Sequence, residues 1–327
     1  MRIMHAKSSC CSALVRRFGK RRRQCKSCKS TWSIRRKKRG PKRIRTAHPL
    51  LRRILCEGYT LAQELRHFDS LGRSGIAQRF TNELQNFISS PPPPLPKGIY
   101  ILIVDGVYFK FKRKEWVLYL MALKPVHSHR MYYLDPVLTK GRERFEEWCK
   151  AIDTIPTKTR KQIKALVSDG LRGFHQLATQ NDWVHQRCQF HLLASLVRGK
   201  GKLRYLTRGS NVRRKLLTAT RIMLSNESSQ KRSRAQRSLR QYINDPNCPS
   251  YVRKHIIEFL EREADFRSYL THPHLHLPTT TSAMESTGRL VRKATRTART
   301  PNSLFLRAVA FLRLKRSVVC NGSYTQN

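Results

Sequence analysis

Three acidic residues are set apart from the other carboxylates of this chain by the residues around them. Asp105 follows the apolar run 99–104, Asp169 follows the apolar run 165–167 after one serine, and Glu285 opens a helical pattern. An aspartate at the end of a buried strand is costly unless a partner binds it. Carboxylate oxygens are the hard ligands that Mg²⁺ and Mn²⁺ prefer. The sequence therefore predicts that Asp105, Asp169 and Glu285 together bind divalent metal.

Two such ions, about 3.5–4 Å apart, can activate a nucleophile and stabilise the leaving oxygen in a phosphodiester displacement. Each Asp-Gly pair alone is often a simple turn, so the prediction depends on two strand–Asp–Gly patterns combined with a downstream glutamate. Most of the other acids, among them Glu143, Glu146 and Glu147, lie in helical patterns that indicate solvent-exposed faces. They are not assigned to the site.

The charge of the chain indicates its partner. There are 67 Lys and Arg residues against 20 Asp and Glu residues, a formal net charge of +47. Self-repulsion of this size opposes compaction, so we expect a polyanionic partner. Nucleic acid is the first candidate and an anionic membrane surface is the second.

The apolar patterning and the cysteines indicate the compartment. No run approaches the roughly 18 apolar residues of a membrane-spanning helix, and the N-terminus lacks the apolar core of a signal peptide. The nine cysteines are odd in number and unevenly spread, which suits thiols or metal ligands in a reducing compartment. We expect a cytoplasmic protein without a membrane partner, associated with the nucleoid if DNA is its substrate.

The acids need a sheet to position them, and the apolar periodicity predicts one. The expected elements are strands over 99–109, 116–124 and 130–138, a helix over 142–152, a strand over 163–167, a helix from Leu171 and a strand at Val184. This order is that of a ribonuclease H-like α/β core, a mixed five-stranded sheet with helices on both sides. Asp105-Gly106 interrupts the first strand, so Asp105 and Asp169 are expected at neighbouring strand ends.

An all-α insertion and two helices follow the core strands. The basic helical insertion is predicted over about 192–278, a helix begins around Glu285, and a last helix covers 303–319. The histidines in the Pro-containing loop before Glu285 alternate, and they either face solvent or bind metal from one side of an extended segment. They are His272, His274 and His276.

Residues 1–40 form a basic segment that resembles a zinc ribbon. Two thiolates in a Cys-x-x-Cys pair can share one tetrahedral zinc ion, and a third ligand is expected from the earlier cysteines. The candidate ligands of this structural zinc are Cys11, Cys25 and Cys28. A regular four-cysteine spacing is missing, so a degenerate ribbon or thiols in a flexible basic arm remain the alternative.

Residues 41–90 are predicted to form three helices, with Thr60 capping the second. A short helix, a tight turn and a longer helix that opens with Arg73 and Ser74 are typical of a helix-turn-helix that binds DNA. The alternative is a helical hairpin packed on the main domain. The Pro-rich linker 91–98 is a stiff spacer, and the catalytic domain is predicted over 99–327.

Three motifs carry a resemblance to a known family. Residues 167–174 read VSDGLRGF, residues 186–191 read QRCQFH, and residues 280–286 read TTSAMES. From about residue 99 to 319 the chain resembles the Mutator-like transposases of bacterial insertion sequences. That family has a DDE triad and a C/D-x-x-H motif between its second aspartate and its glutamate.

The resemblance implies roles for the matching residues. Asp105, Asp169 and Glu285 match the triad, which implies two Mg²⁺ or Mn²⁺ ions, and Cys188 and His191 match the accessory pair. The resemblance also implies DNA cleavage that leaves 3′-hydroxyls, followed by their attack on target DNA. Basic residues on the helix after the glutamate are candidate clamps for the DNA backbone: Arg289, Arg292, Lys293 and Arg296.

The predicted function is that of a DNA transposase that binds the terminal inverted repeats of its element and target DNA. Such enzymes act in paired complexes, so a homo-oligomer is expected on DNA. Two alternatives remain open. One is a metal-dependent nuclease of the same fold that does not transfer strands, and the other is a non-catalytic DNA-binding relative of a transposase.

Overall fold

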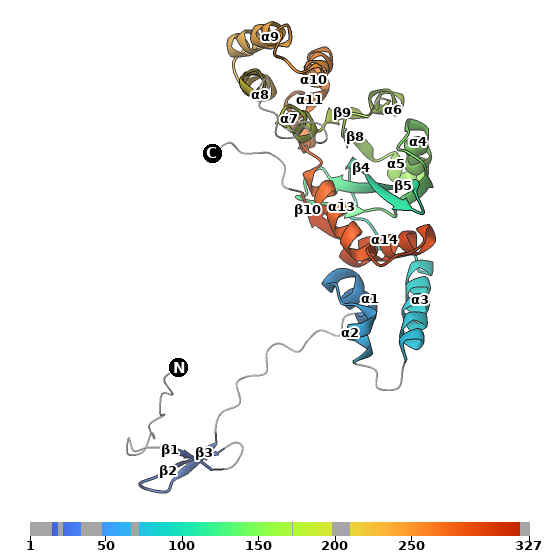
Figure 1. The fold of residues 1–327 in the computed structure, drawn as a ribbon, viewed down its shortest axis with the longest axis vertical. Coiled ribbons are helices and arrows are strands. Elements are labelled where there is room, and N and C mark those ends of the chain that lie inside the picture. Colours follow the sequence, from blue (N-terminus) through green and yellow to red (C-terminus); the bar gives the residue numbers. More distant parts are fainter. Residues whose placement is uncertain are drawn as a thin grey trace. The chain divides into compact units, whose positions relative to one another are not determined.

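The computed structural model describes residues 15–18, 22–33, 48–66, 72–171, 173–197 and 210–320 (Figure 1). The chain divides into two compact units, Met1–Ala47 and His48–Asn327. The second unit includes residues 48–90 of the predicted helix-turn-helix segment and the Pro-rich segment. The finer division of the chain at residues 40, 90 and 98 stays a prediction.

The first unit contains a three-stranded antiparallel sheet of β1 (Val15–Arg17), β2 (Arg22–Cys25) and β3 (Thr31–Ser33). Cys25 ends β2 and is buried, whereas Cys28 lies in the turn to β3 and is exposed. Cys11 lies outside the described residues. A hairpin that carries Cys-x-x-Cys at its turn is compatible with half of a zinc ribbon, and zinc binding stays a prediction.

The second unit is built on a mixed seven-stranded sheet in the order β10-β6-β5-β4-β8-β9, with β7 also paired to β5. Its strands are β4 (Tyr100–Phe111), β5 (Lys114–Pro125), β6 (Arg130–Tyr133), β7 (Val137–Lys140), β8 (Ile163–Ser168), β9 (Val184–Arg187) and β10 (Ser317–Val319). β8 runs parallel to β4 and β9 runs parallel to β8, while β5, β6, β7 and β10 pair antiparallel with their neighbours.

The prediction of five strands is wrong at two places. The expected strand 130–138 is two strands, because Pro136 has no N–H to donate to a ladder and the pairing breaks beside it. The expected helix 303–319 ends at Lys315. Arg316 has a φ of 58°, which redirects the chain into β10.

The central strand β4 is buried on both faces because successive side chains enter different apolar clusters. Ile101 and Ile103 pack with α13 (Ser282–Thr295) and α14 (Pro301–Lys315). Leu102 and Val104 pack with α4 (Phe145–Asp153) and α6 (Phe174–Gln180). The alternation explains why the sequence of β4 is continuously apolar. A short helix, α5 (Thr157–Arg160), precedes β8.

The three N-terminal helical segments of this unit belong to the same core as the sheet. They are α1 (Pro49–Arg52), which continues as a π-helical turn η1 (Arg53–Glu57), α2 (Leu61–Leu65) and α3 (Arg73–Ser89). Thr60 caps α2 as predicted, because its side chain accepts from the Gln63 N–H and the Gln63 side chain accepts from the Thr60 N–H. Phe80 and Leu84 of α3 pack in one cluster with Leu304 and Phe311 of α14.

A helical insertion lies between β9 and α13, as the sequence predicts. It has its own apolar cluster. Its elements are α7 (Gln189–Val197), α8 (Ser210–Leu224), α9 (Ser229–Ile243), α10 (Ser250–Glu261), α11 (Glu263–Phe266), α12 (Ser268–Thr271) and the 3-10 turn η3 (Pro273–Leu275). Among the described residues, the helices are too short or too polar to cross a membrane.

Candidate active site

Two neighbouring strands bring Asp105 and Asp169 together. Ile103 of β4 pairs in parallel with Val167 of β8, and each lies two residues before one of the aspartates. Asp169 follows the end of β8. Asp105 does not end its strand, because β4 continues to Phe111 and Asp105 pairs with Leu120 of β5. The expectation of an interrupted strand is therefore wrong, while both aspartates lie at the same level of the sheet.

Helix α13 carries Glu285 in its first turn and packs closely on β4. A Cβ on Gly288 would lie 2.9 Å from Val107 Cγ2, so the absence of a side chain permits this approach. Glu285 Oε1 is buried without a hydrogen-bond partner among the described residues, and it lies 3.4 Å from His191 Nε2. This oxygen therefore has His191 as an ion-pair partner and keeps its lone pairs available to a bound cation.

The acids act on one another electrostatically. Burial raises the pKa of Asp105 to about 7, with a further increase from Asp169 and smaller ones from Glu285 and Glu143, while His191 opposes the rise. Like charges that share a site raise each other's pKa in this way. The structure therefore places the three predicted carboxylates in one electrostatic neighbourhood, where bound cations would favour their ionised forms.

A fourth acid, Glu143, borders this neighbourhood and is missed by the sequence analysis. Its carboxylate accepts from the Tyr108 hydroxyl at 2.7 Å and from Trp148 Nε1 at 2.8 Å. Burial raises the pKa of Glu143, and Asp169 adds to the rise. The prediction of a solvent-exposed Glu143 is wrong, because the residue precedes α4 and turns under Gly106, where a Cβ would lie 2.8 Å from its Oε1. Its proximity to Trp148 in the sequence is the signal that could have found it.

Cys188 links the end of β9 to the start of α13. Its Sγ accepts from the Thr281 N–H at 3.2 Å and from the Thr281 hydroxyl at 3.3 Å, and its own N–H donates to the Ser168 carbonyl at 2.8 Å. Cys188 therefore helps to hold Glu285 near the aspartates. Burial raises the pKa of Cys188, but His191 and Thr281 outweigh it and lower the pKa overall.

His191 faces the acids from α7. Interaction with Cys188 raises the pKa of His191 to about 9 against an opposing effect of burial, and Glu285 and Asp169 add to the rise. These surroundings favour the protonated form of the imidazole. The predicted accessory pair thus combines a positioning thiol with a positive charge beside Glu285.

The predicted DNA-contacting residues are all exposed. Arg289, Arg292, Lys293 and Arg296 occupy the solvent side of α13 and its C-cap, opposite the buried Met284 and Val291. Arg73 and Ser74 lie exposed in the first turn of α3. These side chains are accessible to phosphate groups.

The alternating histidines before α13 do not line one side of an extended segment. Residues Pro273–Leu275 form a 3-10 turn, with the rings of His272 and His274 6.0 Å apart. The ring of His276 instead lies 5.5 Å from that of His127. The interpretation as an extended metal-binding loop is wrong, because the turn changes the direction of successive side chains.

The donor set of the three acids fits Mg²⁺ or Mn²⁺, which prefer carboxylate oxygens. The acids are not gathered as tightly as the ligands of a single ion. Across the described part of the chain, the set of three side chains whose ligand atoms all lie within 4.8 Å of one another is a different one, namely His175, His185 and Asp265.

Comparison with family models and with curated proteins finds no match for this chain. Among solved structures, a chain of the simian T-cell lymphotropic virus intasome in complex with PP2A regulatory subunit B56 gamma is 16% identical. The match covers 58% of this chain and 70% of that chain, with a TM-score of 0.21.

Two further matches are to NurA, one bound to dAMP and manganese and one with manganese. Each is 11% identical over 73% of this chain, with TM-scores of 0.14 and 0.13. The match spans 59% and 64% of those two chains. All three TM-scores lie below 0.5, so these similarities do not indicate the fold or the function of this chain.

Proposed function

We propose that this protein is a transposase that cleaves and transfers DNA strands with divalent metal ions, using Asp105, Asp169 and Glu285. One observation carries the proposal. Half-buried carboxylates from β4, from the end of β8 and from α13 act on one another electrostatically in a chain whose formal net charge is +47. A group of acids is costly in such a site unless cations bind to it.

The three acids would hold the ions, and His191 and Cys188 would favour the charge and the position that the acids need for ion binding. When bound, two Mg²⁺ or Mn²⁺ ions would supply an activated nucleophile and stabilisation of the leaving oxygen. Asp105, whose pKa is raised to about 7 mainly by burial, would hold an ion in its ionised form. The positive charge of His191 favours ionised Glu285, and Cys188 fixes the start of α13 through Thr281.

The fold proposed for residues 99–320 is ribonuclease H-like. Antiparallel β4, β5 and β6 followed by parallel β8 and β9, with helices on both faces, support it. In this arrangement the helical insertion separates Asp169 from Glu285 along the sequence while the sheet and α13 bring them together.

The DNA contacts are proposed on the basic exposed surface. Arg289, Arg292, Lys293 and Arg296 contact backbone phosphates near the acids, which contributes affinity that falls with salt. Recognition of the element's terminal repeats is assigned to residues 1–88, with Arg73 and Ser74 at the start of the helix that reads base edges. A homo-oligomer would bring the two DNA ends of the element together. The candidate zinc of residues 1–40 would have a structural role.

Asp169→Asn tests the site. The substitution keeps the side-chain oxygen that accepts from the Leu171 N–H at 3.1 Å but removes a charged ligand. We expect DNA binding to persist while Mg²⁺-dependent cleavage of DNA flanking the gene falls by about 10³-fold or more. Asp182→Asn is the matched control, because Asp182 is exposed with a φ of 55°, a conformation that Asn adopts readily. Cleavage by Asp169→Asn at the wild-type rate would contradict the site.

A strand-transfer assay separates the proposal from its alternatives. Pre-cleaved ends with 3′-hydroxyls should be joined to target DNA. Cleavage without joining indicates the nuclease alternative, and DNA binding without either reaction indicates a non-catalytic relative.

A further inference from the structure

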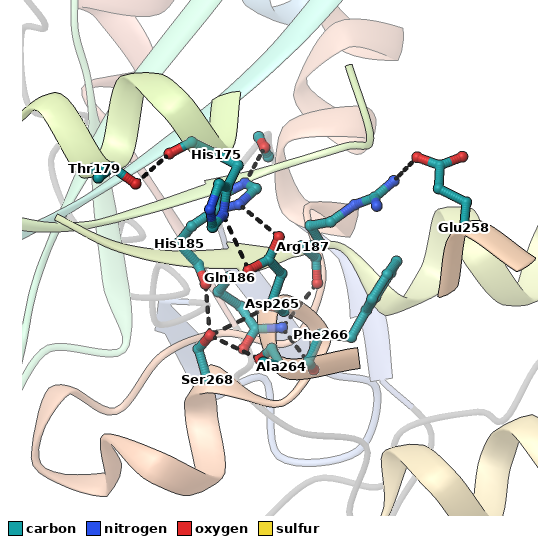
Figure 2. A network of polar contacts seen from close by, with 11 residues as sticks. His175, Thr179, His185, Gln186, Arg187, Glu258, Ala264, Asp265, Phe266 and Ser268 are labelled. Atoms are coloured by element: carbon teal, nitrogen blue, oxygen red, sulfur yellow. Dashed lines mark hydrogen bonds and ion pairs between the residues drawn. The ribbon is translucent and has the colours of Figure 1, made fainter. Parts of the chain in front are cut away.

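Three side chains from different elements converge in a second cluster, which includes none of the proposed catalytic acids. His175 comes from α6, His185 from β9 and Asp265 from α11, and Figure 2 shows them pointing toward one another. His175 Nδ1 lies 3.2 Å from Asp265 Oδ1, and His185 Nδ1 lies 3.6 Å from Asp265 Oδ2. One ligand atom from each of the three residues lies within 4.8 Å of the other two.

Two atoms of this cluster are buried and lack the partners that buried polar atoms need. His185 Nδ1 and Asp265 Oδ2 have no hydrogen-bond partner among the described residues. Their separation of 3.6 Å is too long for a hydrogen bond between them. It is close to the roughly 3.4 Å between two ligands that each lie about 2.1 Å from a tetrahedral zinc ion.

The other nitrogen of His185 is already engaged. His185 Nε2 lies 3.0 Å from the Ser168 hydroxyl. When Nε2–H donates to that hydroxyl, the lone pair of Nδ1 faces the carboxylate of Asp265, so two acceptors meet. Metal-binding histidines are commonly fixed in this way, with one ring nitrogen held by a second partner and the other directed at the ion.

We propose that His175, His185 and Asp265 bind a divalent transition-metal ion of the zinc type. Two imidazoles and one carboxylate are ligands that suit zinc rather than magnesium, which prefers oxygen donors. The histidines line an open hollow of about 420 Å³, and the side chain of His175 is 53% exposed. Water can therefore reach the fourth coordination position.

The bound ion would fasten the helical insertion to the sheet. Asp265 belongs to the insertion, whereas His185 lies on an edge strand of the sheet. Hydrogen bonds already run along the same junction: Ser268 Oγ donates to the His185 carbonyl at 2.6 Å, and Gln186 Nε2 donates to the Phe266 carbonyl at 3.0 Å. The ion adds a link between these elements, close to the strand that precedes Asp169.

A serine-hydrolase role is excluded for Ser168, His185 and Asp265. Their contacts run from hydroxyl to imidazole to carboxylate as in a serine hydrolase triad, but Ser168 is fully buried and no substrate can reach its hydroxyl. A simple ion pair of protonated His185 with Asp265 is the competing interpretation. It requires no metal, so metal content separates the two.

The test measures zinc bound to the full-length chain after dialysis against metal-free buffer. Cys25→Ser/Cys28→Ser removes the candidate ribbon ligands, and we expect one equivalent of zinc to remain. Adding His175→Ala should remove that equivalent, whereas adding His274→Ala, at an exposed histidine outside the cluster, should leave it. Zinc absent from the cysteine variant, or retained after His175→Ala, would overturn the proposal.

Cobalt substitution tests the site without changing its ligands. In the Cys25→Ser/Cys28→Ser protein, Co²⁺ should give a visible absorption band without the near-ultraviolet charge-transfer band of a thiolate ligand. Asp265→Asn should abolish the visible band. A spectrum with thiolate charge transfer, or no visible band at all, would place the metal elsewhere or exclude it. Neither outcome bears on the proposed catalytic acids.

Discussion

At the scale of single residues, Asp105 is held in a position that disfavours its ionised form. Burial and Asp169 raise its pKa from an ordinary value of 3.8 to about 7. The folded protein therefore binds this proton more tightly than the unfolded chain does. The stability contributed by the proton is complete below about pH 4 and is lost as the pH rises through 7.

Asp105→Asn should stabilise the metal-free protein at alkaline pH, because Asn has no charge to bury. The expected gain in the free energy of unfolding grows from nearly zero at pH 4 to at most about 4 kcal/mol at pH 8. Urea unfolding in EDTA measures it, with Asp182→Asn as the control that should show no pH-dependent difference. A gain that is equal at pH 4 and pH 8 would show that the Asp105 carboxyl titrates normally.

Single-residue patterns predict part of the site. Asp105, Asp169 and Glu285 are recognisable because acids are rare in this chain and these three adjoin apolar or small residues. Glu143 and Asp265 are missed by these patterns, because each lies in a charged, helical stretch that resembles an ordinary surface. Their burial depends on Tyr108 and His185, which are distant from them in sequence.

At the scale of elements, the position of α13 depends on its contact with β4. Gly288→Ala should place a Cβ against Val107 Cγ2 and move the helix that carries Glu285. We expect Mg²⁺-dependent cleavage to fall by about 10-fold or more, even though Ala favours helix by about 1 kcal/mol over Gly.

A compensating variant controls for this prediction. Val107→Ala/Gly288→Ala removes the clashing methyl groups and should restore most of the cleavage rate. If Gly288→Ala alone cleaves normally, or if the double variant is no better than the single one, the helix position does not depend on this contact.

Elements are predicted best where both faces are buried. The continuous apolar sequences of β4, β5 and β8 identify them as inner strands with nearly correct bounds. Edge elements are predicted poorly. β10 is three residues long and is defined by its pairing with β6, which is distant in sequence. A side-chain hydrogen bond from Arg130 to Ser317 joins the same two strands across 187 residues. No local sequence pattern therefore indicates β10.

At the scale of the whole molecule, residues 48–89 contribute to the core of the second unit. Leu50, Leu51 and Phe80 are buried in the same cluster as Ile101 and Leu304. Deleting residues 1–88, the segment to which recognition of DNA ends is assigned, would therefore also remove part of this core.

Two truncations test this division. Deleting residues 1–47 should change the free energy of unfolding of the remaining unit by less than about 1 kcal/mol. Deleting residues 1–88 should cost more than about 5 kcal/mol, because several large apolar side chains lose a burial worth roughly 1.5–3 kcal/mol each. Urea unfolding compares the two chains, and equal stability would show that residues 48–88 fold independently.

Glu285 of α13 is proposed to act together with Asp105 and Asp169, which precede it by more than a hundred residues. Mg²⁺-dependent DNA cleavage by Glu285→Gln measures this most directly, beside Asp169→Asn and the double variant. We expect each single substitution to lower the rate by about 10³-fold or more, and the double variant to be no slower than either, because the acids work as a unit. Cleavage by Glu285→Gln at the wild-type rate would contradict it.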